Sequence, residues 1–398
     1  MKKLFLAGAM ALAMTAFAAP AMADDTSGLQ TLVNDATPGS TIILTQNYTL
    51  TDTVDITKNI TINGAGYTVT GAANSHVFNI TADANDATLN DIVITASGTG
   101  YGVYTSGKNL EVTDCVINTA NRGITFWPTN GQGATLQVSD TEIYNTDIEN
   151  YDSNADIGDS RGISFSNVTA GDIDIDTCEI YGFGYSLNVI NDPDTNGLRD
   201  SEGTTYDITN SIIKGWTALN LWAADADITF TGSTLVGINT SDGSWDSFAT
   251  IRANDGIYGG SDDQETTINL KGGSVIAKQY GTAAETPFTV DNELQTKFTF
   301  APYNRQVVSI EVYVPGTTAS IFTFPFGVSV DDMNAYMNSD KLVGFFNEAT
   351  GEFDSQNVNI IAAPISAANT VSTMANVSLI DDRMPVLQAD FAVGGNNA

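Results

Sequence analysis

Histidine, cysteine and positive charge are scarce in this sequence. Its 398 residues include one histidine, His76, and two cysteines, Cys115 and Cys178. A structural zinc site takes about four nitrogen or sulfur ligands, so this inventory argues against zinc. A serine–histidine–aspartate triad would depend on His76 alone, and the Gly-, Asn- and Ser-rich stretch around it is typical of an exposed turn.

The charge balance is strongly acidic. Lysine and arginine together number 15, against 47 aspartates and glutamates, which gives a formal net charge of −32. Such a chain repels nucleic acid and anionic membranes. The charge indicates either a solvated surface that resists aggregation or the binding of divalent cations. Hydrophobic residues make up 42% of the sequence, which supports a real core and excludes a disordered acidic protein.

A long hydrophobic run occurs once, at the N-terminus. Residues 4–19 are apolar, follow Lys2 and Lys3, and precede the small-x-small site Ala21-Met22-Ala23. This pattern predicts a signal peptide over residues 1–23 rather than a membrane span. The mature chain of 375 residues (398 minus 23) has a net charge of −34 once the two lysines are removed. We expect a secreted protein, extracellular, on the cell surface or in the periplasm, with no membrane span in the mature chain.

One eight-residue pattern recurs along the mature chain: apolar, x, apolar, x, small-or-turn, small, x, apolar. Alternate side chains of a strand point to opposite faces, so each copy has one apolar and one polar face. A single copy cannot bury its apolar face, whereas stacked copies can. A β-sandwich also contains short strands at such spacing, but the fixed signature favours a solenoid. The copies begin at Ile60, Ala87, Leu110, Leu136, Ile173, Tyr206, Ile228 and Ile268.

The entry segment fits this interpretation. Residues 27–36 predict a short amphipathic helix with Leu29, Leu32 and Val33 on one face, placed to cap the open end of the solenoid. The Pro-Gly-Ser-Thr-Ile-x-Leu segment at 38–44 and the strand-rich segment at 47–66 follow it. Over about residues 27–285 the chain resembles the pectin-lyase-like β-helix superfamily. The resemblance implies an all-β fold, a right-handed parallel β-helix over residues 24–289.

The resemblance does not fix an activity, since the superfamily includes polysaccharide lyases, glycoside hydrolases, adhesins and non-catalytic surface proteins. The G-H-G and R-I-K motifs of its polygalacturonase-like hydrolases are absent here, as are the W-I-D-H and R-x-P-x-x-R motifs of pectate lyases. A lyase needs only one suitably placed base over an ion that neutralises a carboxylate. If the protein is a lyase, Arg122 or Arg161 is the candidate base.

Arg122 and Arg161 each precede a glycine at the start of a second strand, in adjacent turns of the repeat. Tyr101 and Tyr185 hold the same place in the flanking turns, so we expect these four residues to stack along one side of the solenoid. Two interpretations stay open: a platform for a sugar chain, or a corner ladder held by cation–π contacts. The glycines break the strand alternation and leave the direction of these side chains undecided.

Three long segments interrupt the repeat, at about residues 144–160, 190–204 and 239–264. Long loops on a rigid scaffold often carry binding sites, and Trp245 in the last of them is a candidate for stacking on a sugar. The second segment reads D-P-D-T-N-G-L-R-D from Asp192. It resembles the calcium loops of thrombospondin type 3 and dockerin-like repeats.

That resemblance implies calcium as a cofactor, held by the carboxylates Asp192, Asp194 and Asp200, by Asn196, and by the carbonyl of Leu198. The pattern departs from the family at its last carboxylate, where position 12 is Gly203 and Glu202 lies one place early. A plain Asp/Asn/Gly turn is the alternative.

The two cysteines occupy the same place in the pattern, with Thr141 in the copy between them. They are therefore two rungs apart, or roughly 9–10 Å at about 4.8 Å per rung. A disulfide needs Cα atoms within about 7 Å. We predict that Cys115 and Cys178 are small buried side chains and form no disulfide.

After Leu270 the pattern fades, and residues 290–398 predict a smaller β-rich C-terminal module with a hairpin over residues 343–353. Its strand, strand, helix, hairpin order resembles the β-grasp repeats of bacterial surface proteins, and a cap or docking module fits equally. Three functions stay open. The first is a non-catalytic surface or adhesive protein with a glycan or cell-surface partner. The second is a calcium-assisted polysaccharide lyase or another polysaccharide-active enzyme, and the third is a structural or assembly component.

Overall fold

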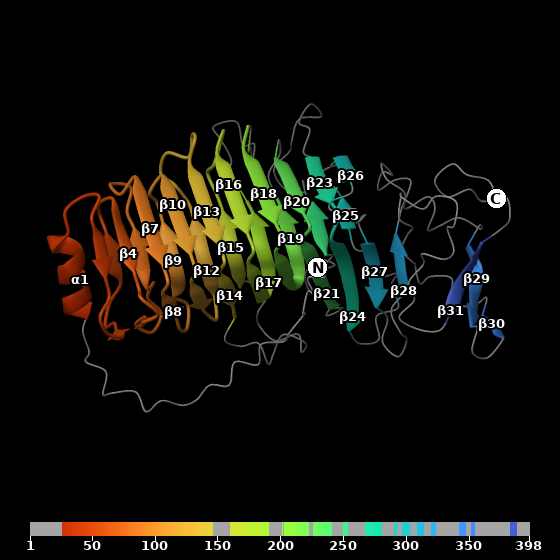
Figure 1. The fold of residues 1–398 in the computed structure, drawn as a ribbon, viewed down its shortest axis with the longest axis horizontal. Helices are drawn as coiled ribbons and strands as arrows, with labels where there is room; N and C mark the ends of the chain where they lie inside the picture. The colour runs from red at the N-terminus through yellow and green to blue at the C-terminus, as the bar shows by residue number, and fades with distance from the viewer. Residues whose placement is uncertain are drawn as a thin grey trace, which may run out of the picture.

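Stacked parallel strands build an elongated solenoid, capped at its N-terminal end by a helix (Figure 1). The computed structural model describes residues 26–145, 160–190, 201, 203–222, 226–240, 250–253, 267–280, 290–292, 297–301, 303, 309–313, 320–323, 342–347, 352–354 and 383–387. The predicted signal peptide, residues 1–23, lies outside the described residues. No helix among the described residues is long and apolar enough to cross a membrane.

Among the described residues, the first face of the solenoid is a ten-stranded sheet with one strand from each turn, so ten turns of the parallel stack are described. The first strands of the eight-residue pattern build this face, in register from turn to turn. Its strands, in spatial order, are β1 (Thr41–Ile43), β4 (Ile60–Asn63), β7 (Asp86–Asn90), β10 (Asn109–Thr113), β13 (Thr135–Ser139), β16 (Asp172–Asp176), β18 (Thr205–Thr209), β20 (Asp227–Thr231), β23 (Thr267–Lys271) and β26 (Lys297–Ala301).

The second and third faces form two parallel ladders that join through two long strands, β17 (Glu179–Val189) and β19 (Ile212–Leu221), which run around the corner between them. The second face also contains β2 (Tyr48–Thr49), β5 (Thr68–Thr70), β8 (Val93–Thr95), β11 (Val116–Asn118), β14 (Glu142–Tyr144), β21 (Thr234–Thr240), β24 (Ser274–Tyr280) and β27 (Ser309–Tyr313). The third face contains β3 (Val54–Ile56), β6 (Phe78–Ile80), β9 (Tyr101–Thr105), β12 (Arg122–Phe126), β15 (Arg161–Phe165), the C-terminal halves of β17 and β19, β22 (Ile251–Ala253) and β25 (Val290–Asn292).

The apolar positions of the repeat fill the interior as the sequence predicts. On the first face, one interior row runs through Ile62, Leu89, Val112, Val138, Ile175, Ile208, Phe230 and Leu270, and all are buried. Each turn therefore completes its core only against the turns above and below, which is the physical reason for the repeat.

The turn position of the pattern has a backbone explanation. From β7 to β23 its residue adopts a positive φ in every turn, the left-handed region that Gly, Asn and Asp tolerate best. The residues are Asp91, Asp114, Asp140, Thr177, Asn210, Gly232 and Gly272, with φ between 48° and 63°. The sharp bend there directs the chain from the first face into the second.

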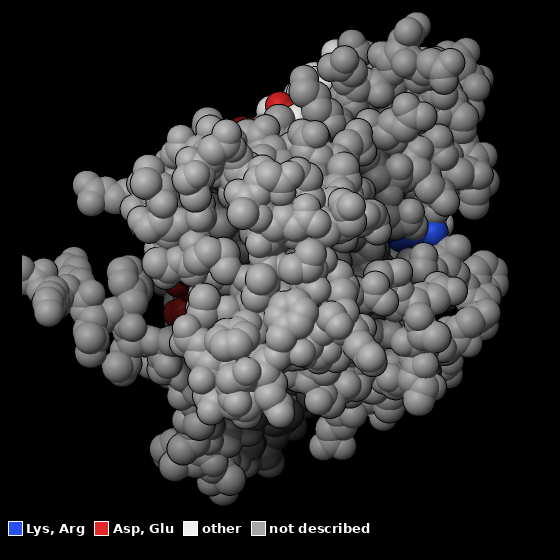
Figure 2. Space-filling view, turned by 90° about the vertical axis from the view of Figure 1, so that its right-hand side faces the viewer, with Lys and Arg blue, Asp and Glu red and all other residues white. Residues whose placement is uncertain are grey.

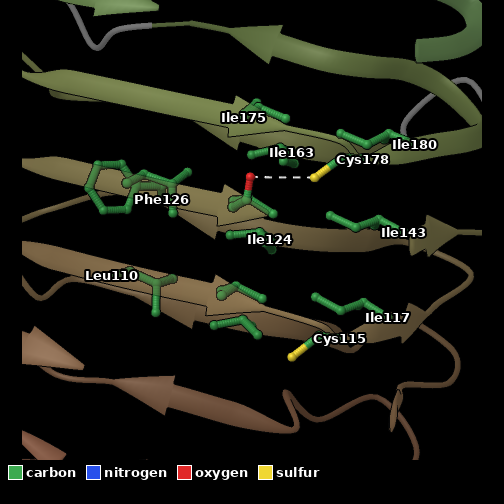
Figure 3. Close-up of a cluster of buried hydrophobic side chains, with 14 of the residues drawn as sticks. Leu110, Cys115, Ile117, Ile124, Phe126, Ile143, Ile163, Ile175, Cys178 and Ile180 are labelled. Carbon is green, nitrogen blue, oxygen red and sulfur yellow. Dashed lines mark hydrogen bonds between the residues drawn. The ribbon is translucent and has the colours of Figure 1, made fainter. Parts of the chain in front are cut away.

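The next position points into the solenoid and holds both cysteines. Cys115 and Cys178 are free and buried (Figure 3). They lie in alternate turns, and Thr141 holds the same place in the turn between them. The prediction of no disulfide is confirmed. Burial raises the pKa of Cys115 to about 11 and that of Cys178 to about 12. Hydroxyls at this position complete the backbone hydrogen bonding: Cys115 N–H donates to Thr141 Oγ1 at 3.2 Å, and Cys178 N–H to Ser211 Oγ at 3.0 Å.

The capping helix is present as α1 (Thr26–Asp35), which packs against β2 and β3. Leu29 and Val33 are fully buried, but Leu32 is 42% exposed. The predicted helix and its apolar face are present, with Leu32 the least buried of the three side chains. Leu32 lies at the rim of that face, because consecutive positions such as 32 and 33 are about 100° apart around a helix.

Parallel pairing continues beyond residue 289, where the sequence pattern fades. β25, β26 and β27 pair in register with β22, β23 and β24, so the solenoid ladder extends further than the repeat indicated. β28 (Ser320–Thr323) then pairs antiparallel with β27. A separate antiparallel sheet has the order β30 (Glu352–Asp354), β29 (Leu342–Asn347) and β31 (Arg383–Leu387). The predicted hairpin corresponds to β29 and β30.

Candidate functional site

The third face brings together four of the predicted site residues. Tyr101, Arg122, Arg161 and Tyr185 are direct register partners in four consecutive turns, which is the stack that the sequence predicts. We call them the arginine–tyrosine ladder. All four side chains are half-buried, so each keeps part of its surface in solvent.

Glycines determine that this ladder points outward. An added Cβ at Gly123 would lie 2.3 Å from Ile143 Cγ2, a buried core atom, and 2.6 Å from the carbonyl oxygen of Gly162. At Gly162 it would lie 2.4 Å from Ile180 Cγ2. The glycine position therefore faces the core at contact distance, and the residue before it faces out. This is the point that strand alternation alone leaves undecided.

Each arginine of the ladder packs on a tyrosine. The guanidinium carbon of Arg122 lies 5.0 Å from the centroid of the Tyr101 ring, and that of Arg161 lies 4.3 Å from the centroid of Tyr185. Arg161 Nη1 also donates a hydrogen bond to the carbonyl oxygen of Ser160 at 3.0 Å. These cation–π contacts hold two planar cations in fixed positions along the solenoid axis.

Two further residues join the ladder at its N-terminal end: Tyr104, which the sequence did not single out, and His76, which the sequence placed in an exposed turn and which is half-buried here. The His76 ring lies 4.4 Å from the Tyr101 ring and 5.4 Å from the Tyr104 ring, measured between centroids. Gly102 and Val103 are both buried, which breaks the alternation of β9, so Tyr104 faces outward in the same turn as Tyr101 although three positions separate them. The aromatic-Gly-x-aromatic spacing at 101–104 is the sequence signal that could have identified it.

Burial changes the titration of this cluster. Burial lowers the pKa of His76, and the positive charge of Arg122 lowers it further. Burial raises the pKa of Tyr104, with a contribution from Tyr101. Both shifts favour the neutral forms, so Arg122 carries the charge of this part of the face.

A second outward-facing row lies beside the ladder, and it is buried. Its residues, Thr125, Ser164, Asn188, Asn220 and Arg252, are register partners and between 2% and 6% exposed. Asn220 Nδ2 donates to Asn188 Oδ1 at 2.8 Å, and Asn188 Nδ2 donates to Ser164 Oγ at 3.0 Å. We call this the amide row. Polar side chains in alternate strand positions predict an exposed surface, so its burial could not be read from the sequence.

The C-terminal end of the amide row contacts the ladder directly. Arg252 Nη1 donates to the Tyr185 hydroxyl at 3.4 Å, and its guanidinium carbon lies 5.6 Å from the Trp222 ring centroid. An arginine thus packs on an aromatic ring at three places on the third face: Arg122 on Tyr101, Arg161 on Tyr185 and Arg252 on Trp222. The half-buried groups of the face are the guanidinium donors of Arg122 and Arg161 and the tyrosine rings, along a line parallel to the solenoid axis, while the amide row beside them is buried.

Carboxylates gather elsewhere, on the first face. Asp172, Asp174, Asp176, Asp207 and Asp227 lie on the neighbouring strands β16, β18 and β20. Burial and the adjacent carboxylates raise the pKa of Asp174 and of Asp207, an effect that Lys271 partly offsets for Asp207. No group of three or more His, Cys, Asp or Glu side chains in the described part of the chain is arranged to hold a metal ion. In a view along the solenoid, the visible atoms of described acidic residues and those of described basic residues also lie on different sides of the molecule (Figure 2).

The remaining predicted site residues lie outside the described residues. These are Asp192, Asp194, Asn196, Leu198 and Asp200 of the predicted calcium loop, and Trp245. The structure shows where the loop is attached: it leaves the third face after Val189, the last residue of β17, and returns to the first face at Thr205, the start of β18. It therefore departs from the strand that carries Tyr185 and Asn188.

Comparison with known proteins gives likeness of fold alone. No family model and no curated protein matches the chain. Among solved structures, the pectate lyase Pel9A matches with a TM-score of 0.38 and 13% identity, covering 69% of this chain and 67% of the lyase. The Geobacillus virus E2 protein ORF18 matches with a TM-score of 0.42 and 14% identity, covering 72% of this chain and 60% of the viral protein. The fold assignment rests on the strand pairing described above, which is that of a parallel β-helix.

Proposed function

We propose that this is a secreted or cell-surface β-helix that binds a glycan without cleaving it, and that the third face is the binding surface. The observation that carries the proposal is the arginine–tyrosine ladder. Two arginines and two tyrosines occupy the same place in four consecutive turns, half-buried and fixed by their mutual contacts. A rigid row of aromatic and guanidinium groups suits an extended chain whose units repeat along the same axis.

The ligand that best fits this row carries both hydroxyl and acidic groups. The guanidinium planes favour carboxylate or sulfate oxygens, and the tyrosines provide apolar contact for sugar rings. The protein's overall negative charge opposes acidic ligands in general. Binding should therefore depend on contacts at the ladder rather than on long-range attraction.

Two observations favour binding over cleavage. The catalytic motifs of the lyases and hydrolases that the sequence resembles are absent. Arg122 and Arg161 lie on the third face and pack on tyrosines, whereas the densest described carboxylates lie on the first face. A lyase that uses either arginine as its base needs that residue above ion-binding carboxylates.

A glycan array tests the proposal, with an assay for unsaturated products on the same acidic polysaccharides. The mature protein is compared with the double variant Arg122→Gln/Arg161→Gln. Lys271→Gln, which removes one positive charge away from the third face, is the control for the change in charge, because Lys271 is exposed on the first face. We expect binding without product, and a loss of affinity of about tenfold or more in the double variant, equal to about 1.4 kcal/mol. Product formation that is abolished in the arginine variant would show that the protein is a lyase. Equal binding by the wild type, the double variant and the control would show that the ladder is not part of the binding site.

We also propose that calcium binds the loop at residues 192–200 and makes it rigid. The alternation of oxygen-bearing side chains around Gly197 supports this. Extracellular calcium modules often have dissociation constants of about 0.1–1 mM. Calorimetric titration with calcium should show one site in this range that is lost in Asp194→Asn. Asp207→Asn, on the first face, controls for the acidic surface, and an equal loss there would assign the calcium to that surface.

A further inference from the structure

The one histidine of the chain lies at the N-terminal end of the arginine–tyrosine ladder. The backbone N–H of Tyr101 donates a hydrogen bond to Nδ1 of His76 at 3.3 Å. The His76 ring packs on the rings of Tyr101 and Tyr104. Because Nδ1 accepts a hydrogen bond, it carries no proton in this arrangement, and the neutral ring holds its proton on Nε2.

The charges around His76 oppose its protonation. Tyr101 and Tyr104 of β9 and Arg122 of β12 are the titratable and charged groups that face it among the described residues. Burial raises the pKa of Tyr104, so this residue adds no negative charge beside His76. The Arg122 guanidinium packs on the Tyr101 ring at 5.0 Å. Arg122 lies in the turn that follows Tyr101, whereas His76 lies in the turn that precedes it. An imidazolium at position 76 would therefore place a second cation against the ring that already supports Arg122.

We infer that His76 is a proton-sensitive positioning residue, and that its protonation loosens the contact between Tyr101 and Arg122. A proton on Nδ1 turns this atom from acceptor to donor, so the hydrogen bond from Tyr101 N–H is lost. The two cations then repel each other through the Tyr101 ring. The last link, from this contact to ligand affinity, rests on the proposed glycan function; the change within the ladder does not.

The sign of the effect on stability follows from linkage. The folded protein holds the pKa of His76 below its unfolded value, so the unfolded chain binds more protons in the intervening range. The contribution of His76 to stability is complete above the unfolded value, about 6.5, and decreases as the pH falls through the folded value. Protonation of His76 at acid pH should therefore lower the stability of the folded protein.

An NMR titration without ligand tests the coupling. The mature protein has one histidine, so its imidazole signals are unambiguous. We expect a midpoint below that of the urea-unfolded protein, a rise of this midpoint in Arg122→Gln, and a shift of the Arg122 side-chain signal with the same midpoint. His76→Asn keeps a hydrogen-bond acceptor that does not titrate, and should abolish the shift. A midpoint that does not respond to Arg122→Gln, or an Arg122 signal indifferent to pH, would overturn the inference.

A binding titration then separates this inference from the proposed function. A hexameric oligogalacturonate serves as the probe, between about pH 8 and pH 5, where histidine titrates. We expect affinity to change several-fold across the His76 midpoint in the wild type and to stay level in His76→Asn. Absence of binding at every pH would count against the proposed function and leave the NMR result to decide the coupling. Binding with the same pH dependence in both proteins would contradict the role of His76.

Discussion

Arg161 and Tyr185 are register partners in adjacent turns, and the guanidinium carbon of Arg161 lies 4.3 Å from the centroid of the Tyr185 ring. Arg122 has the same relationship with Tyr101, but in the opposite direction along the axis. The two arginines are themselves partners, and each packs on the tyrosine that lies away from the other. Each aromatic face thereby offsets part of the repulsion between two like charges one turn apart.

The Arg161–Tyr185 contact should appear as a coupling energy. In a double-mutant cycle with Arg161→Gln and Tyr185→Leu, we expect about 0.5–2 kcal/mol of stabilising interaction, the range of partly buried cation–π pairs. The free energy of unfolding in urea gives the measurement. A cycle with Arg161→Gln and Tyr101→Leu is the control, since these residues are two turns apart and should be additive within about 0.5 kcal/mol. Equal coupling in both cycles would contradict the contact.

Gly123→Ala should destabilise the protein by about 2–4 kcal/mol, because the new methyl group meets a core side chain at 2.3 Å and a carbonyl oxygen at 2.6 Å. Gly66→Ala is the matched control. Gly66 has open space around an added Cβ but a φ of 77°, so it should lose only about 1 kcal/mol from backbone strain. Chemical denaturation of both variants compares them. A smaller loss at Gly123 than at Gly66 would show that the corner can relax.

Thr177 is a β-branched residue in the left-handed region, with a φ of 57°. The next turn places Asn210 there, with a φ of 50°. We expect Thr177→Asn to stabilise the protein by about 1 kcal/mol, since asparagine adopts this conformation with less strain. The reciprocal change, Asn210→Thr, should destabilise it by a similar amount. Melting of the two variants provides the test, and shifts of the same sign would show that something other than φ governs this position.

The buried thiols should be nearly inert in the folded protein. With the pKa of Cys115 raised to about 11, the thiolate fraction near pH 8 is about 100-fold lower than for a free thiol. Labelling with a disulfide reagent should therefore be at least that much slower in the native protein than in urea. Ser97→Cys supplies a positive control, because residue 97 is exposed and a thiol there should be labelled rapidly in the native protein. Rapid native labelling would show that the corner is open to solvent.

Much of the fold could be predicted from the sequence because its determinants are local. Alternation of apolar and polar residues specifies which side of a strand faces the core. The turn residue that follows, such as Asp91 or Asp114, is of a type that tolerates a positive φ and adopts one in the structure. Since the same eight positions recur, parallel stacking and the register of the first face follow from them. The stacking of Tyr101, Arg122, Arg161 and Tyr185 followed from the same register.

The sequence by itself thus determined the parallel β-helix, its repeat and the position of the arginine–tyrosine ladder. Only the tertiary structure decided that the ladder faces outward, because this depends on how closely Gly123 and Gly162 approach isoleucines of adjacent segments. It also decided that His76 and Tyr104 join the ladder, and that the amide row beside it is buried. Contacts of this kind join residues 20 or more positions apart, such as Asn188 and Asn220. Local periodicity carries no information about the distances between them.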